Sequence, residues 1–249
     1  MKPLLKFFLK HYLKFLTNFV IYIHHPVVIA IAGSTNKTFT KQAIIRILTD
    51  HDISFRANPN SFNTEIGLPL AILNLPSGYH SHRKWLPIIL KSFVRIFKKF
   101  PKYLILELGI SDKSDMKYLL KLIKPSIAVI TDITQRYLDS FSGMDELADE
   151  YGYLIKKINK NGLILLNNDN NRIISFINDA RAQIITFGFS PTSDYRANKI
   201  TKYSHGQKFE VITKGKINEY QIPYFGRHHI YSFLAALIIN SYVDKTEKI

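Results

Sequence analysis

Hydrophobic residues fall into two alternating patterns along most of the chain. Short continuous runs rich in Val, Ile and Leu occupy residues 27–32, 103–106, 127–130, 163–166 and 183–187. Between them, apolar residues recur at helical spacing over 42–48, 70–73, 85–100, 115–123, 144–157 and 172–180. A continuous apolar run indicates a strand buried on both faces, and strands that alternate with helices indicate parallel pairing. The pattern therefore predicts an α/β fold, with a doubly wound and mostly parallel sheet flanked by helices.

The pattern changes after residue 194. Apolar and polar residues alternate within 208–213 and 219–223, which is typical of strands with one buried face. The intervening Lys214-Gly215-Lys216 has the composition of a hairpin turn. We therefore expect a small antiparallel subsheet near residues 194–225, followed by an apolar helix over 230–242.

Residues 1–26 combine apolar residues with lysines at positions 2, 6, 10 and 14. Lysines at a spacing of four form a stripe on a helix and make a transmembrane span improbable, and no small-residue cleavage site follows. We expect a basic amphipathic helix that either packs on the domain over residues 27–249 or makes peripheral contact with a membrane surface. The expected apolar face, covering the sheet or touching lipid, comprises Leu5, Phe8, Leu9, Tyr12, Phe15, Leu16 and Phe19.

Composition narrows the classes of function. The chain has 249 residues, of which 46% are hydrophobic, so it is long enough to bury a sizeable core. A net charge of +15 suits nucleotides, nucleic acid or an anionic membrane, although a solvated Lys-rich surface is the alternative. No nucleic acid partner is expected, because charge alone is weak evidence without a binding module. The absence of cysteine excludes disulfides, thiolate metal sites and a Cys nucleophile.

The first predicted strand is followed by a short polar turn and then by a predicted helix. A strand, a turn and a helix N-terminus together form an anion site, where Lys37 can reach phosphates and Thr38 can ligate Mg²⁺. The general pattern of a phosphate-binding loop has glycine where this chain has Asn36. Asparagine tolerates a positive φ better than other non-glycine residues, so the turn is compatible with this function. An ordinary surface turn is the alternative.

Glu107 follows the run 103–106 and therefore stands at the carboxyl end of a predicted strand. Ligands of open parallel sheets bind at these ends, and carboxylates are ligands that Mg²⁺ prefers. Glu107 is thus a candidate metal ligand, with a surface acid at a strand end as the alternative.

Several separated motifs agree in order and spacing with one family over residues 27–242. The chain resembles the central, ATP-binding domain of the Mur ligases, most closely the branch that adds D-alanyl-D-alanine to UDP-muramoyl tripeptide. The matching segments are Ala32-Gly33-Ser34-Thr35-Asn36-Lys37-Thr38-Phe39-Thr40-Lys41, Asn63-Thr64-Glu65-Ile66-Gly67-Leu68-Pro69, Leu106-Glu107-Leu108-Gly109, Lys124-Pro125, Asn167-Asn168-Asp169 and Gly226-Arg227-His228. The resemblance implies a P-loop-type fold and an ATP-dependent ligase of peptidoglycan precursor synthesis.

The resemblance also implies the cofactors and site residues. ATP would phosphorylate a carboxylate of the UDP-muramoyl peptide, and the amine of D-alanyl-D-alanine would then attack the acyl phosphate. Lys37 and Glu107 are the expected catalytic residues, and Thr38 and Glu107 are the expected Mg²⁺ ligands. The residues expected at ATP are Gly33, Ser34, Thr35, Asn36, Lys37, Thr38, Asn167, Asp169, Arg227 and His229, and those expected at the substrate are Asn63 and Thr64. Without the resemblance, Asn167-Asn168-Asp169 is also typical of a helix cap.

The chain departs from the family pattern at positions that carry chemistry. The substituted positions are Asn36 for the last loop glycine, Tyr137 for a metal-binding histidine, Tyr151 for a carbamylated lysine, Tyr153 for a nearby glutamate, and His229 and Ser232 for two asparagines at the adenine. A phenol is a poor Mg²⁺ ligand at neutral pH, so we expect the second metal site to be lost or rebuilt.

The domains that usually flank this central domain are also not found, including the C-terminal ligase domain. Two interpretations of the chain are therefore open: it is a fragment of a longer cytoplasmic ligase, or it is a divergent central domain. The alternative function is a catalytically inactive nucleotide-binding scaffold at the membrane surface. In either case we expect the isolated chain to form no product from tripeptide, dipeptide and ATP.

Overall fold

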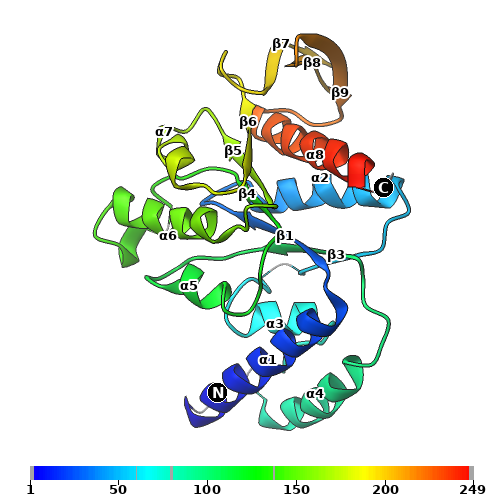
Figure 1. The fold of residues 1–249 in the computed structure, drawn as a ribbon, viewed down its shortest axis with the longest axis vertical. Helices are drawn as coiled ribbons and strands as arrows, with labels where there is room; N and C mark the ends of the chain where they lie inside the picture. The colour runs from blue at the N-terminus through cyan, green and yellow to red at the C-terminus, as the bar shows by residue number, and fades with distance from the viewer. Residues whose placement is uncertain (1–2, 60, 79–80, 137, 247–249) are drawn as a thin grey trace.

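The computed structural model describes residues 3–59, 61–78, 81–136 and 138–246, in which a nine-stranded sheet runs from the middle of the molecule to one end, where its last three strands lie (Figure 1). The strand order is β2-β3-β1-β4-β5-β6-β7-β8-β9, with parallel pairing from β2 to β7 and antiparallel pairing from β7 to β9. The strands are β1 (Val27–Ala32), β2 (Phe55–Ala57), β3 (Tyr103–Glu107), β4 (Ile127–Ile130), β5 (Leu163–Asn167), β6 (Gln183–Gly188), β7 (Tyr195–Tyr203), β8 (Gly206–Thr213) and β9 (Lys216–Ile222). The predicted class, a mostly parallel sheet with a small antiparallel part, is confirmed.

Helices connect most of the parallel strands. They are α1 (Pro3–His24), α2 (Lys37–Asp50), α3 (Gly67–Ile72), α4 (His82–Arg95), α5 (Asp115–Leu119), α6 (Met144–Lys157), α7 (Asn171–Ile174) and α8 (Arg227–Thr246), with 3-10 turns η1 (Leu138–Ser140) and η2 (Ile177–Asp179). The prediction of one helix over 172–180 is wrong, because the chain leaves the helix after Ile174 and resumes as η2. This break accompanies the burial of Phe176, whose ring packs against Gly152 of α6.

The sheet separates two hydrophobic layers. Alternate residues of β1 show the separation: Val28 and Ala30 belong to the layer that contains α5 and α6, whereas Ile29 and Ile31 belong to the layer that contains α2 and α8. Side chains of a strand alternate between faces, so each residue of the continuous apolar run has a layer to enter. This explains why the central strands contain few polar residues.

A third hydrophobic cluster joins α1 to α3 and α4 at the end of the molecule opposite β7–β9 (Figure 1). Its buried α1 residues are Leu9, Leu13, Leu16 and Val20. The predicted apolar face is therefore wrong in part: Leu9 and Leu16 are buried, but Phe8, Phe15 and Phe19 are exposed, and Leu5 lies outside the described side chains. The helix has two apolar sides, and the buried one packs mainly on α3 and α4. No described helix has the length and apolarity needed to cross a bilayer.

The predicted hairpin is present between β8 and β9. Thr213 pairs with Lys216, which leaves Lys214 and Gly215 as a two-residue turn with φ angles of 49° and 73°. Two successive positive φ angles fit the turn whose twist matches paired antiparallel strands. The hairpin extends the same sheet through β7.

Strand β1 lies between β3 and β4, although both follow it in the chain. The connection after β1 therefore leads to β2 on one side, whereas the connection after the neighbouring β3 leads to β4 on the other side, so the two leave the carboxyl ends of adjacent strands in opposite directions. In open α/β sheets a crevice forms at such a reversal, and ligands bind there. The turn after β1 opens into this crevice.

Candidate functional site

The turn between β1 and α2 requires glycine at its first position. Gly33 has a φ of 139°, and a Cβ atom there would lie 2.2 Å from Thr131 Oγ1 and 2.9 Å from the backbone nitrogen of Asp132. The Ser34 amide donates to the Asp132 carbonyl oxygen at 2.7 Å. These contacts hold the turn against the segment after β4, at the place where phosphate binding is predicted.

Asn36 occupies the position where the general pattern has glycine. Its backbone is left-handed, with φ 65° and ψ 3°, so the expectation that asparagine tolerates a positive φ here is confirmed. The Asn36 side chain donates to the His228 carbonyl oxygen at 2.8 Å, and Thr40 Oγ1 donates to the Asn36 carbonyl oxygen at 2.9 Å. The turn is therefore tied to the start of α8 as well as to α2.

Lys37 lies folded over the turn. Its ammonium group donates to the Gly33 carbonyl oxygen at 2.5 Å and to the Ser34 carbonyl oxygen at 3.5 Å. Burial lowers the pKa of Lys37 below its ordinary value, Glu107 opposes this shift, and Arg136 adds to it. A positive charge thus lies at the centre of the turn, next to the backbone N–H groups of the helix N-terminus.

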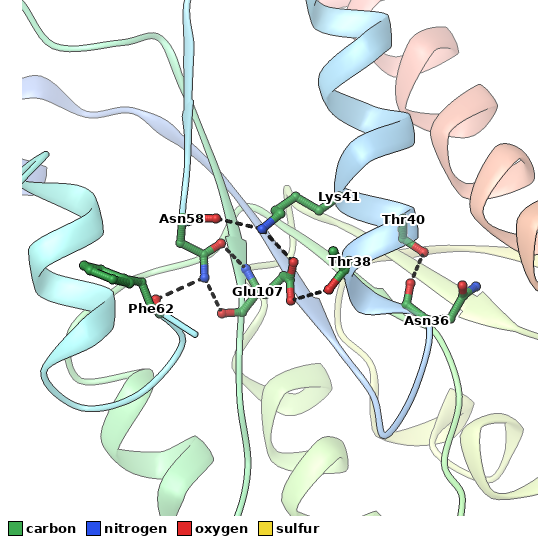
Figure 2. A network of polar contacts seen from close by, with 7 residues as sticks. All are labelled: Asn36, Thr38, Thr40, Lys41, Asn58, Phe62 and Glu107. Carbon is green, nitrogen blue, oxygen red and sulfur yellow. Dashed lines mark hydrogen bonds and ion pairs between the residues drawn. The ribbon is translucent and has the colours of Figure 1, made fainter. Parts of the chain in front are cut away.

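Glu107, at the carboxyl end of β3, lies between two side chains of α2 (Figure 2). Thr38 Oγ1 donates to Glu107 Oε2 at 3.2 Å, and Lys41 Nζ lies 2.7 Å from Glu107 Oε1. The Lys41 and Glu107 side chains are only 6% and 8% exposed, so the pair is buried. Two of the predicted residues, Thr38 and Glu107, are thus brought into contact.

Asn58 completes this network (Figure 2). Its side chain accepts from the Glu107 amide at 2.9 Å and donates to the Glu107 carbonyl oxygen at 3.1 Å, and its own carbonyl oxygen accepts from Lys41 at 2.7 Å. Sequence reasoning gave no role to Lys41 or Asn58. The available signal is that Lys41 follows Thr38 by three residues and Lys37 by four, which puts all three on one side of the helix.

A pocket of about 570 Å³ lies in front of this network. It is lined by residues 34–39 of the turn and α2, by Glu107, and by Asn63 and Thr64 from the loop before α3. The Gly109 amide donates to the Asn63 carbonyl oxygen at 3.0 Å, which holds this loop beside the end of β3. The residues predicted for phosphate, metal and substrate therefore line one pocket.

Asn167 and Asp169 lie outside that pocket and make internal bonds. Asn167 is buried and donates to the Thr131 carbonyl oxygen at 2.8 Å. Asp169 accepts from the amides of Phe189 and Ser190 and from the Tyr231 hydroxyl, each at 2.7 Å. Burial raises the pKa of Tyr231, and the Asp169 carboxylate adds to that shift. The alternative interpretation of this segment, a helix cap, applies to the next residue: Asn170 accepts from the Ile173 amide at the start of α7.

Arg227 and His229 lie at the start of α8, among aromatic rings. The Arg227 guanidinium lies 4.8 Å from the centre of the Phe189 ring. The His229 ring stacks on Tyr224 at 4.8 Å and meets the edge of Phe39 at 4.5 Å. Burial lowers the pKa of His229, and the neighbouring His228 lowers it further. The turn is thus bordered by an aromatic cluster that the sequence did not indicate.

The oxygen atoms of Thr38 and Glu107 fit a magnesium ion. Mg²⁺ takes oxygen ligands and is usually held by one or two carboxylates together with substrate phosphates and water. No group of three or more His, Asp or Glu side chains in the described part of the chain could hold a metal ion. A second metal would find no donor in Tyr151, which is buried in α6, and Tyr137 lies outside the described residues.

Tyr153 and Ser232 also have contacts in the structure. Tyr153 is half-buried on α6, with Lys157 Nζ 5.3 Å from the centre of its ring. The Ser232 hydroxyl is 3.2 Å from Thr40 Oγ1 and donates to the His228 carbonyl oxygen at 3.1 Å. Ser232 therefore joins α8 to α2 rather than facing the pocket.

Comparison with known proteins gives consistent matches to this part of the fold. The family model of the Mur ligase middle domain matches residues 31–240. A UDP-N-acetylmuramoyl-tripeptide–D-alanyl-D-alanine ligase of Buchnera aphidicola is 30% identical over 213 residues, which is 85% of this chain and 41% of that protein. The Escherichia coli protein of the same name is 25% identical over 222 residues, 88% of this chain and 44% of its own length. This chain thus spans less than half the length of these relatives.

Solved structures agree on the fold. The MurF ligase of Thermotoga maritima in complex with ADP superposes with a TM-score of 0.77 at 18% identity, covering 95% of this chain and 49% of that one. MurF from Acinetobacter baumannii gives a TM-score of 0.74 at 20% identity, covering 92% and 46%.

Proposed function

Because this chain belongs to the Mur ligase family, whose middle domain it contains, we propose that it binds ATP in the pocket in front of Lys37 and activates a carboxylate for ligation. The observation that carries this proposal is the contact of Thr38 with Glu107 at the mouth of a glycine-dependent turn. It supports a phosphate and Mg²⁺ site where α2 begins. The comparisons favour a ligase of peptidoglycan precursor synthesis over the inactive scaffold.

In this proposal the turn and α2 hold the phosphates. The backbone N–H groups of residues 35–38 bind phosphate oxygens, and Lys37 exchanges its bonds to the Gly33 and Ser34 carbonyl oxygens for bonds to the terminal phosphates. Thr38 and Glu107 would hold Mg²⁺, which would supply positive charge beside the transferred phosphoryl group. Arg227 and His229, with the rings of Phe39 and Tyr224, border the nucleotide on the side of α8. Asp169 supports this side through its bond from Tyr231 of α8, whereas Asn167 supports the segment after β4 through its bond to Thr131.

The proposed reaction has two steps. A carboxylate oxygen of the substrate attacks the γ-phosphorus as the bond to ADP breaks, and an amine nitrogen then attacks the acyl carbon as phosphate leaves. Asn63 and Thr64 line the pocket across from the turn and would hold the carboxylate partner. From the names of the relatives, we propose UDP-muramoyl tripeptide as that partner and D-alanyl-D-alanine as the amine.

Calorimetric titration of the full chain with ATP and Mg²⁺ tests the proposal. Wild type should bind weakly, because Asn36 makes the turn less open than glycine would, and Lys37→Ala should abolish binding. Lys156→Ala, which removes an exposed lysine of α6, is the matched control and should bind as wild type does. Equal titration curves for wild type and Lys37→Ala would show that the pocket is not the phosphate site.

Ligation requires more than nucleotide binding. Holding the carboxylate, the phosphoryl group and the amine together contributes about 7–11 kcal/mol to lowering a barrier of this kind. The relatives have more than twice the length of the region matched here, so we expect this chain alone to show no phosphate release that depends on both substrates. Substrate-dependent release by the purified 249-residue chain would contradict that expectation and assign the whole reaction to it.

A further inference from the structure

Large apolar side chains are exposed mainly on two helices. Among the described residues, fifteen large hydrophobic side chains are exposed, and eleven of them belong to α1, to α4 or to the turn after α4. On α1 they are Phe7, Phe8, Phe15, Phe19, Tyr22 and Ile23, and on α4 and its following turn they are Leu86, Leu90, Phe93, Val94 and Phe97. Their exposed fractions run from 41% for Phe19 to 77% for Phe97. We refer to these eleven residues as the α1–α4 surface.

The exposed side chains of α1 and those of α4 both lie beside the contact between these two helices. The Tyr12 hydroxyl of α1 donates to the Ile89 carbonyl oxygen of α4 at 3.2 Å, and further along His24 Nε2 lies 3.1 Å from the Ile96 carbonyl oxygen. Residues three or four apart are neighbours on a helix surface. Phe8 and Phe15 therefore adjoin Tyr12 on α1, and Phe93 adjoins Ile89 on α4. The exposed apolar side chains thus flank the contact between the two helices, which lie at the end of the molecule opposite β7–β9 (Figure 1).

The same two segments carry most of the excess positive charge. Residues 1–26 contain four lysines, residues 76–102 contain seven lysines and arginines, and neither segment contains an acidic residue. Two of the four lysines, Lys6 and Lys10, pair with Glu65, so most of the unpaired charge among the described residues lies on the second segment. Lys84, Lys91 and Lys98 are exposed; Lys84 and Lys91 lie on one side of α4 beside its apolar stripe, and Lys98 lies three residues after the end of the helix. None of these three forms an ion pair within the described part of the chain.

We propose that the α1–α4 surface binds the face of an anionic lipid bilayer, with both helices in the plane of the interface. A large exposed apolar patch marks an interaction site, and a basic helix with aromatic residues on its apolar side is suited to lipid headgroups. A second copy of this chain fits less well, since it would bring the same positive charge to the contact. A nucleic acid would leave the apolar stripe without a partner.

Co-sedimentation of the full chain with vesicles tests this proposal. One set of vesicles contains equal parts of phosphatidylglycerol and phosphatidylcholine, and the other contains phosphatidylcholine alone. Wild type should sediment with the anionic set and much less with the neutral set, and added salt should weaken the binding. Light scattering measures the oligomeric state of each protein in parallel.

Two sets of substitutions separate the two parts of the surface. The charge variant combines Lys84→Glu, Lys91→Glu and Lys98→Glu. Each lost lysine should lower the binding constant for anionic vesicles by a factor of about five, so the three substitutions together should lower it by about a hundredfold or more. The apolar variant combines Phe15→Ser, Phe93→Ser and Phe97→Ser and should lose at least about tenfold. The matched controls lie on the β8–β9 hairpin: Lys214→Glu with Lys216→Glu, and Ile217→Ser, all at exposed positions.

Each outcome decides the proposal. Loss of sedimentation in both variants, with the controls unaffected and the melting temperature retained, supports it. Equal sedimentation with neutral and anionic vesicles, or variants that sediment as wild type does, would overturn it. A wild-type dimer that the apolar variant converts to a monomer, without vesicle binding, would assign the surface to a second copy instead. Nucleotide titration of the same variants should be unchanged, so this test is independent of the proposed ATP site.

Discussion

Replacing Lys41 with methionine should destabilise the protein strongly, although Lys41 does not line the pocket. Methionine keeps most of the length of the side chain but removes the ammonium group that lies 2.7 Å from Glu107 Oε1 and 2.7 Å from the Asn58 carbonyl oxygen. The Glu107 carboxylate stays buried and keeps only Thr38 as a side-chain donor. The variant therefore leaves a negative charge in the protein interior without its cation.

The magnitude follows from burial. Removing one partner of a buried ion pair costs about 3–5 kcal/mol, because the remaining charge is not solvated. Each kcal/mol shifts the melting temperature of a domain of this size by about 2–4 °C, so Lys41→Met should melt about 6–20 °C below wild type. The double variant Lys41→Met with Glu107→Gln removes the uncompensated charge and should recover to within about 2 kcal/mol of wild type.

Urea unfolding followed by circular dichroism gives the free energies of unfolding for the cycle of wild type, the two single variants and the double variant. Lys199→Met is the matched control, since Lys199 Nζ lies 2.8 Å from Glu210 Oε1 but its side chain is 67% exposed. An exposed pair of this kind contributes about 0–1 kcal/mol. A cost below about 1 kcal/mol for Lys41→Met, or a double variant no more stable than Lys41→Met, would refute the reasoning.

Three further outcomes test the site and its surroundings. Gly33→Ala should cost about 2–5 kcal/mol and abolish nucleotide binding, because its φ is positive and the new methyl group meets Thr131; retained binding in titration would argue against this. Asn36→Ala should be about 1–2 kcal/mol less stable than Asn36→Gly in urea unfolding, since only glycine adopts φ 65° without strain; equal stability would mean that the turn relaxes. Bonds from Lys113 and Ser142 lower the pKa of Glu146 from 4.5 to about 2, so the ionised side chain stabilises the fold at pH 7. Wild type should therefore have a higher melting temperature than Glu146→Gln at pH 7 and lose this difference as the pH falls from 4.5 towards 2. A difference that does not depend on pH would contradict the assignment.

Elements with a local signal could be predicted from the order of residues alone. The apolar runs that became β1, β3, β4, β5 and β6 need no partner to be recognised, because their period and length are properties of consecutive residues. The hairpin between β8 and β9 has its signal in Lys214 and Gly215. The turn after β1 was also predictable, since its glycine, lysine and threonine lie within six consecutive residues. These signals were sufficient for the fold class and for the place of Gly33, Lys37 and Thr38 in the turn between β1 and α2; their roles at a phosphate and a metal stay predictions.

Contacts between distant segments could not be predicted in this way, because they depend on how whole elements pack. Lys41 and Asn58 gain a role only because α2 and the loop after β2 both reach Glu107, a contact across 49 residues or more that no local pattern encodes. Strand β2 has three residues and pairs only with β3 at the edge, so its hydrophobic pattern is too short to predict it. The side of α1 that is buried was likewise undetermined, because both sides are apolar and the choice depends on where α3 and α4 lie. A side chain's partner is fixed by the packing of whole elements, which helical spacing alone does not contain.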